Sequence, residues 1–136
     1  MAKGKILIVD DDKDYSESLM LMLESYGYIV EQAYNIREGK ASIINEKPQL
    51  IILDVMMEKM TDGFDLCREL KANPALNTIP ILMLTAITDK TGIKYSLEED
   101  SEYLPADDYI SKPISFSDLI SKAERLIKAA ALNVKE

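Results

Sequence analysis

The sequence contains no histidine, and this absence removes several kinds of catalytic site. Without an imidazole the chain cannot form a Ser-His-Asp triad or a Cys-His pair, bind zinc through histidine, or carry phosphohistidine. Cys67 is the one cysteine, so no disulfide can form within the chain, as is typical of a protein from a reducing compartment. Any catalysis must therefore use carboxylates, hydroxyls, lysine or a metal ion.

An excess of basic residues and a long apolar run are also missing. The 16 lysines and arginines are outnumbered by 24 acidic residues, which gives a formal net charge of −8. This balance argues against unaided binding to nucleic acid and suits a metal cation or a basic partner surface. The apolar runs are too short to cross a bilayer, and residues 1–5 do not resemble a signal peptide. We expect a cytoplasmic protein without membrane contact, folded as a single domain over residues 1–136.

Five short apolar runs alternate with polar or amphipathic stretches. Three of the runs are continuous, which is typical of strands covered by helices on both faces of a sheet. The second is shorter and the fifth is weaker, as expected for strands at the edges. The runs cover residues 6–9, 28–30, 50–53, 81–84 and 109–110.

Apolar residues at helical spacing fill the intervals between these runs. The first helix is expected to end at Gly27, the second to begin with a capping box of Asn35 and Glu38, and the last to begin at Ser115. Asp12 is interpreted as the N-cap of the first helix. A fourth helix is predicted within residues 89–106 on thin periodicity. The order is β-α repeated five times, which predicts an α/β fold with a doubly wound parallel sheet.

Polar side chains follow four of the predicted strands. Asp10 and Asp11 follow the first, Asp54 the third, Thr85 the fourth, and Lys112 lies shortly after the fifth. In such sheets ligands bind beyond the carboxyl ends of the strands, where the strand order reverses. Carboxylates gathered there would repel one another unless a cation lay among them, and a site made only of oxygen atoms favours Mg²⁺.

This set of groups has the composition of a phosphoryl-transfer site. A carboxylate beside Mg²⁺ can attack phosphorus and form an aspartyl phosphate. The reaction then needs little beyond positioning and the neutralisation of charge on the phosphoryl oxygens. The ammonium of Lys112 and the hydroxyl of Thr85 are placed to assist the metal ion in that task.

Five segments of the chain, taken together, resemble the signature of response-regulator receiver domains. The match follows the order of motifs in that family and extends over essentially the whole chain. It implies the flavodoxin-like, CheY-like (βα)5 fold, with five parallel strands in the order 2-1-3-4-5. The segments are residues 6–12 (ILIVDDD), 53–57 (LDVMM), 62–64 (DGF), 84–86 (LTA) and 107–113 (DDYISKP).

The resemblance assigns a metal site to the first and third strand ends. Asp54 is implied to be the phosphoacceptor and a ligand of Mg²⁺. Asp11 is implied to bind the metal directly, and Asp10 either directly or through water. Met56 is implied to offer its backbone carbonyl oxygen.

The resemblance also assigns the groups that contact the phosphoryl group. These are Thr85 and Lys112, and Tyr109 is implied to be an aromatic switch that changes rotamer as Thr85 moves. Simple packing of an aromatic side chain in an edge strand is the alternative for Tyr109. Cys67 is interpreted as a small core residue rather than a reactive thiol.

By this resemblance the protein is a switch rather than an enzyme with an independent substrate. A sensor histidine kinase or a phosphotransfer protein would donate the phosphoryl group, and an output protein or a covalently linked output domain would read the change. A phosphorylation-dependent homodimer is a further expectation. No direct contact with nucleic acid is expected of this domain.

Three departures from the family pattern keep another function open. Glu58 occupies a position where the family usually has proline, Thr61 lengthens the loop by one residue, and the segment between Thr85 and Lys112 is longer than usual. A pseudo-receiver that binds a partner without phosphorylation is therefore an alternative.

Two further functions are disfavoured by particular residues. A Mg²⁺-dependent phosphatase with an aspartyl nucleophile needs a second acid two residues after it, where this chain has Met56. A flavodoxin-like FMN binder would need a phosphate loop after the first strand, where three aspartates would repel phosphate.

Overall fold

The computed structural model describes residues 4–54, 62–85, 106–111 and 114–134. Five strands form one sheet in which every neighbouring pair is parallel, in the order β2-β1-β3-β4-β5. The predicted strand order is confirmed, with the reversal between β1 and β3. The strands are β1 (Lys5–Val9), β2 (Ile29–Ala33), β3 (Leu50–Asp54), β4 (Ile81–Thr85) and β5 (Asp108–Ser111).

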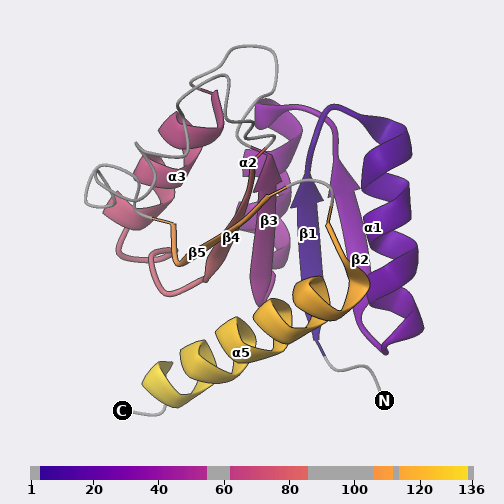
Figure 1. The fold of residues 1–136 in the computed structure, drawn as a ribbon. Coiled ribbons are helices and arrows are strands. Elements are labelled where there is room, and N and C mark those ends of the chain that lie inside the picture. The colour runs from indigo at the N-terminus through magenta and orange to yellow at the C-terminus, as the bar shows by residue number, and fades with distance from the viewer. Residues whose placement is uncertain (1–3, 55–61, 86–105, 112–113, 135–136) are drawn as a thin grey trace.

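Helices cover both faces of the sheet (Figure 1). One core cluster joins the sheet to α1 (Lys13–Ser25) and α5 (Phe116–Val134), and a second joins it to α2 (Ile36–Glu46) and α3 (Asp62–Ala72). Alternate residues of a strand belong to different clusters, because successive side chains point to opposite faces. In β1, for example, Ile8 lies in the first cluster and Leu7 in the second. The two-sided cover accounts for the continuous apolar runs of the three central strands.

Local side-chain chemistry sets where the helices begin. The Asp12 carboxylate accepts a hydrogen bond from the Tyr15 N–H at 3.1 Å and caps α1. At α2, the Asn35 side chain accepts from the Glu38 N–H at 2.8 Å. Glu38 in turn accepts from the Tyr34 N–H at 3.0 Å. The Ser115 hydroxyl accepts from the Asp118 N–H at 3.2 Å before α5. The predicted caps are confirmed at all three helices.

The end of α1 is formed around a glycine. Gly27 has a φ of 106°, and its N–H donates to the carbonyl of Glu24, while the N–H of Tyr28 donates to the carbonyl of Leu23. This pair of bonds is the Schellman arrangement, in which the left-handed position favours glycine. Tyr28 and Leu23 also share the first core cluster, the apolar contact that accompanies such an end.

The second strand differs most from the prediction, whereas the other strands differ by one residue at one or both ends. The second strand runs over Ile29–Ala33, whereas the apolar run covers residues 28–30. The strand continues through Glu31 and Gln32, which are half-buried, because an edge strand exposes one side and tolerates polar residues there. The helix predicted within residues 89–106 lies outside the described residues. No helix in the described part of the chain has the length and apolar content to cross a membrane.

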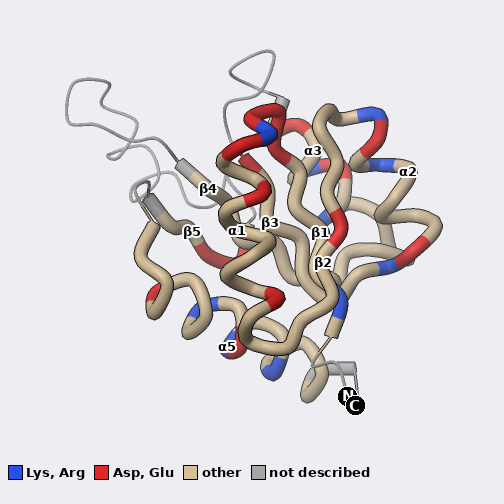
Figure 2. The backbone as a smooth tube through the Cα atoms, turned by 90° about the vertical axis from the view of Figure 1, so that its right-hand side faces the viewer, with Lys and Arg blue, Asp and Glu red and all other residues tan. Residues whose placement is uncertain are grey.

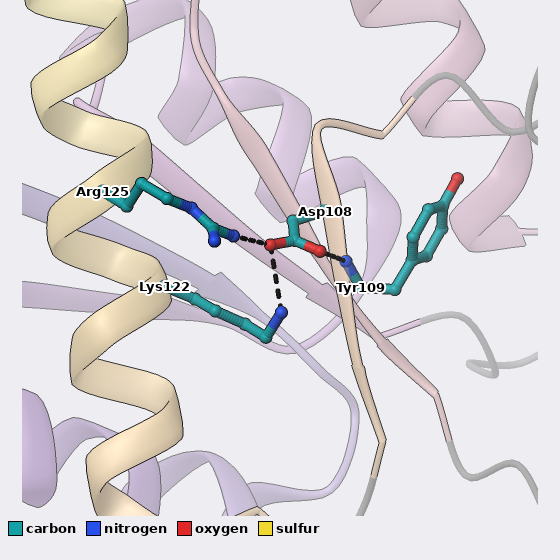
Figure 3. Close-up of polar contacts among 4 residues, drawn as sticks. All are labelled: Asp108, Tyr109, Lys122 and Arg125. Carbon is teal, nitrogen blue, oxygen red and sulfur yellow. Dashed lines mark hydrogen bonds and ion pairs between the residues drawn. The ribbon is translucent and has the colours of Figure 1, made fainter.

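The edge strand β5 is tied to helices on both faces of the sheet. Asp108 at its start forms ion pairs with Lys122, at 3.1 Å, and with Arg125, both on α5 (Figure 3). The preceding Asp107 pairs with Lys71 of α3 at 2.7 Å and accepts a hydrogen bond from the Ile81 N–H at 2.8 Å. Two adjacent aspartates therefore fix the start of β5 from opposite sides.

Candidate functional site

The parallel strands bring three carboxylates together at one edge of the sheet. β1 and β3 are neighbours, with Val9 paired to Leu53, so Asp10 and Asp54 leave the two strands at the same level. Asp11 follows directly. Asp10, Asp11 and Asp54 each offer a carboxylate oxygen, and these oxygens all lie within 4.8 Å of one another. The cluster predicted from the strand ends is therefore present.

Burial makes this cluster unusual among groups of acidic residues. The Asp10 side chain is 0% exposed and Asp54 is 4% exposed, whereas Asp11 is exposed to solvent. Asp10 accepts a hydrogen bond from the Asp12 N–H at 2.9 Å, so the turn that begins α1 holds it in place. Two buried carboxylates in one cluster carry a large electrostatic cost unless a cation compensates for it.

The donor atoms fit a hard divalent cation. They are all carboxylate oxygens, which suit Mg²⁺ or Ca²⁺ better than a metal that prefers sulfur or imidazole. Asp11 is exposed to solvent, so a cation in solution has access to at least one carboxylate of the cluster. Acidic residues also gather around the start of α1, which raises the local concentration of cations (Figure 2).

The fourth and fifth strands end beside this cluster. Asp54 is paired with Leu84 of β4, and Thr85 is the next residue, itself paired with Ser111 at the end of β5. The backbone of Thr85 therefore lies one position beyond Asp54 on the neighbouring strand. The side chain of Thr85, and all of Met56 and Lys112, lie outside the described residues, as do Glu58 and Thr61. Their predicted roles stay predictions.

Tyr109 lies in the middle of β5 and is partly buried against the second core cluster. Burial raises the pKa of its hydroxyl to about 12, although a hydrogen bond from the backbone of Ala106 acts in the opposite direction. The phenol is therefore neutral at physiological pH. The structure places the residue at the edge strand as expected, and its role as a switch stays a prediction.

Sequence reasoning did not identify Tyr15 as a site residue. It lies in the first turn of α1 and packs, partly buried, against the first core cluster. Burial, and then the charges of Asp10, Asp54 and Asp12, raise the pKa of its hydroxyl, while a hydrogen bond with the backbone of Ile114 lowers it. Tyr15 thus connects the neighbourhood of the acidic cluster with the segment that follows β5. Its position three residues after the N-cap indicated only a core contact.

Comparison with known proteins agrees with this architecture. A family model described as the response regulator receiver domain matches residues 6–124. Among curated proteins, the phosphate regulon transcriptional regulatory protein PhoB of Pseudomonas aeruginosa is 37% identical over 128 residues, which cover 94% of this chain and 53% of PhoB. The DNA-binding dual master transcriptional regulator RpaA of Synechocystis is 34% identical over 124 residues, which cover 91% of this chain and 49% of RpaA.

Solved structures of receiver domains and response regulators are also similar to this chain. The signal receiver domain of a signal transduction histidine kinase from Syntrophus aciditrophicus superposes with a TM-score of 0.80 and 41% identity, covering 93% of this chain and 91% of that one. A putative response regulator from Chloroflexus aurantiacus has a TM-score of 0.80 and 33% identity, with coverage of 92% and 98%. The chain spans about half the length of the curated relatives but nearly all of these two solved chains.

Proposed function

This chain belongs to the response regulator receiver domain family, and we propose that it is a switch that is phosphorylated on Asp54 in the presence of Mg²⁺. Receiver domains of response regulators are signalling switches of two-component systems rather than enzymes of the usual kind. The proposal goes further by naming the acceptor, the metal ion and the supporting residues.

The observation that carries the proposal is the position of Asp54 in the buried acidic cluster. A carboxylate oxygen of Asp54 attacks the phosphorus atom, and the bond between phosphorus and the donor group breaks. Asp10, Asp11 and Asp54, with the backbone carbonyl of Met56, would hold the Mg²⁺. When bound, the ion supplies positive charge for the phosphoryl oxygens.

Residues of the two neighbouring strand ends would complete the site. The Thr85 hydroxyl would donate a hydrogen bond to one phosphoryl oxygen, and the Lys112 ammonium would pair with another. Support comes from the pairing of Thr85 with Ser111, since Lys112 follows Ser111 directly in the chain. In the phosphorylated state, Tyr109 would change rotamer as Thr85 moves and so alter the surface formed by β5 and its surroundings.

The proposed partners follow from the chemistry of the switch. A sensor histidine kinase or a phosphotransfer protein would donate the phosphoryl group in the cytoplasm. Residues 1–136 would act as one receiver domain, read by an output protein or by a covalently linked output domain. The two transcriptional regulators compared above are about twice as long as this chain, which leaves room in those proteins for a further, covalently linked domain. We also propose that the phosphorylated protein forms a homodimer.

The experiment uses acetyl phosphate as a small phosphoryl donor. The protein is incubated with donor and Mg²⁺, and its intact mass is followed over time. We expect the gain of one phosphoryl group, no gain without metal, and no gain in Asp54→Asn. Asp65→Asn is the matched control, because Asp65 is an exposed aspartate of α3 that is not a member of the acidic cluster, so this variant should leave the reaction unchanged.

A second measurement guards against a short-lived product. Beryllofluoride mimics the phosphoryl group on an aspartate, and its Mg²⁺-dependent binding can be followed by calorimetry. If neither phosphorylation nor beryllofluoride binding were found, the switch proposal would fail. The alternative would then be a pseudo-receiver that binds a partner without phosphorylation. The loop around Glu58 would be the first segment to test by mutation, because it departs from the family pattern.

A further inference from the structure

We propose that Ser16 and Gln32 are positioning residues for the metal site, because their side chains close a ring of hydrogen bonds that holds Asp10 in the acidic cluster. This inference rests on the proposed function, in which Asp10 would be a ligand of Mg²⁺. It adds two neutral residues, one on α1 and one on the edge strand β2, that the strand-end motifs do not include.

The backbone part of the ring lies in the turn between β1 and α1. The Asp10 N–H donates to the carbonyl of Ala33 in β2 at 3.0 Å. The Asp10 carboxylate accepts from the Asp12 N–H at 2.9 Å, and the Asp12 carbonyl accepts from the Ser16 N–H at 2.9 Å. The carboxylate of Asp10 is therefore joined through Asp12 to the first turn of α1.

Two side chains complete the ring between α1 and β2. The Gln32 Nε2 donates to the Ser16 Oγ at 2.8 Å, and Gln32 directly precedes Ala33, the residue that accepts from the Asp10 N–H. Gln32 faces α1, because it lies two residues after Val30 in the same strand, and Val30 belongs to the core cluster that contains α1. Ser16 is 0% exposed, and a buried hydroxyl of this kind keeps a hydrogen-bond partner.

A second contact joins the same two elements. The Tyr34 hydroxyl donates to the Gln32 Oε1 at 3.2 Å, so both polar atoms of the Gln32 side chain are bonded. The Lys13 ammonium lies 5.0 Å from the centre of the Tyr34 ring, a distance at which a cation and an aromatic face attract each other. Lys13 is the first residue of α1, so this route to β2 does not pass through Ser16.

The polar pair lies where apolar side chains would also pack. α1 lies beside β2 (Figure 1), and Ser16 shares the buried face of the helix with Leu19 and Leu23. Replacing both members of a hydrogen-bonded pair by apolar groups of similar shape is often nearly neutral for stability. A hydrogen bond has a preferred length and direction, so the pair of Ser16 and Gln32 sets how the first turn of α1 lies on β2. That turn in its place holds the carboxylate of Asp10.

The test compares Ser16→Ala and Gln32→Met with Ser18→Ala. Ser18 is an exposed serine of the same helix, and its hydroxyl donates within the helix to the Asp14 carbonyl at 3.1 Å. The three substitutions leave the net charge unchanged. In calorimetric titrations with MgCl₂ and no phosphoryl donor, we expect each of the first two to weaken Mg²⁺ binding about threefold to tenfold. Loss of a group bonded directly to a metal ligand typically costs about 10–100-fold, and Ser16 and Gln32 act one bond further away. Ser18→Ala should match the wild type.

The double variant Ser16→Ala/Gln32→Met separates positioning from packing. Because both substitutions remove the same bond, their effects on Mg²⁺ affinity should not add. The urea concentration at the midpoint of unfolding should stay close to that of the wild type while Mg²⁺ affinity falls. In the metal-free protein, the amide proton of Asp12 should move to lower chemical shift in NMR spectra of the double variant, because its bond to the Asp10 carboxylate lengthens.

Three results would overturn the inference. They are wild-type Mg²⁺ affinity in Ser16→Ala and Gln32→Met, an equal weakening by Ser18→Ala, and additive losses in the double variant. A wild-type protein that binds no Mg²⁺ would instead contradict the proposed function, and this inference with it. The wild-type titration and the titrations of the variants therefore distinguish the two failures.

Discussion

Cys67 shows how burial decides the chemistry of a single side chain. It is fully buried on α3 within the second core cluster, and burial raises the pKa of its thiol to about 12 from an ordinary value of 9. The reactive thiolate is then about a thousandfold scarcer near pH 8 than it would be in an unfolded chain. The interpretation of Cys67 as a core residue is confirmed.

We expect the native protein to resist Ellman's reagent at pH 8 and to react rapidly with one equivalent in 8 M urea. Since the chain has one cysteine, the absorbance change reports this residue alone. Because the folded pKa is raised, folding favours the protonated thiol, so the contribution of Cys67 to stability is complete below pH 9 and is lost as the pH rises towards 12. Rapid stoichiometric labelling of the native protein at pH 8 would contradict the prediction.

At the scale of the residue, the sequence predicts the acidic cluster but not Tyr15. The sequence predicts that Asp10, Asp11 and Asp54 lie together because parallel strands end at a common edge of the sheet. That prediction also assumed that the first and third strands are neighbours, which the structure shows. Tyr15 could not be recognised because helical spacing records only that it faces the core. Its hydrogen bond with the backbone of Ile114 joins two parts of the chain that only the fold brings together.

α1 and α2 each end at a residue with a positive φ, and the residue type differs between the two helices. The effect of that difference on stability can be tested. Gly27 after α1 has a φ of 106°, whereas Lys47 after α2 has a φ of 47° despite its side chain. We expect Gly27→Ala to lower the free energy of unfolding by about 1–2 kcal/mol. Lys47→Gly should raise it by about 0.5–1 kcal/mol by removing the strain of a Cβ atom. Urea unfolding measures both values.

Matched substitutions isolate the backbone effect at these two positions. Lys47→Ala removes the long side chain but keeps the Cβ atom, so it should not reproduce the gain of Lys47→Gly. Gly27→Asn should cost less than Gly27→Ala, because asparagine enters the left-handed region more readily. Equal stability of Lys47→Ala and Lys47→Gly would show that the lysine side chain, and not φ, sets the difference.

At the scale of the element, prediction succeeds where one pattern dominates. The central strands are buried on both faces and read as continuous apolar runs, and the helix caps have specific side chains. β2 extends beyond its apolar run because ladder bonds to β1, rather than hydrophobicity, decide where an edge strand ends. The ion pairs of Asp108 with Lys122 and Arg125 could not be predicted either, since they join a strand to a helix across an unknown packing angle.

At the scale of the whole molecule, the net charge of −8 makes any salt favourable to the compact state. A specific metal site must therefore be separated from general screening. We expect MgCl₂ to stabilise the protein more than NaCl of equal ionic strength, by about 1.4 kcal/mol when free Mg²⁺ is ten times its dissociation constant. Thermal or urea unfolding in the two salts measures the difference.

Asp10→Asn provides the control for that comparison. Asparagine keeps an oxygen that can accept from the Asp12 N–H but removes one buried negative charge from the cluster. We expect this variant to be more stable than the wild type without metal, by roughly 1–2 kcal/mol, the usual size of a single-site effect. In this variant MgCl₂ should stabilise the protein no more than NaCl of equal ionic strength does. If the difference in stability between the two salts were the same as in the wild type, Mg²⁺ would bind elsewhere.

The ion pairs of Asp108 have a mechanical consequence for the molecule. They attach β5 to the middle of α5, and nine further residues of the helix follow Arg125 up to Val134. Leu126 is still buried in the first core cluster and Ile127 packs against it, so the part of α5 beyond the core is residues 128–134, about 10 Å long at 1.5 Å per residue. A rotation of about 10° at the attachment would displace the far end of the helix by about 2 Å, so a small tilt of the edge strand would be amplified at the end of α5.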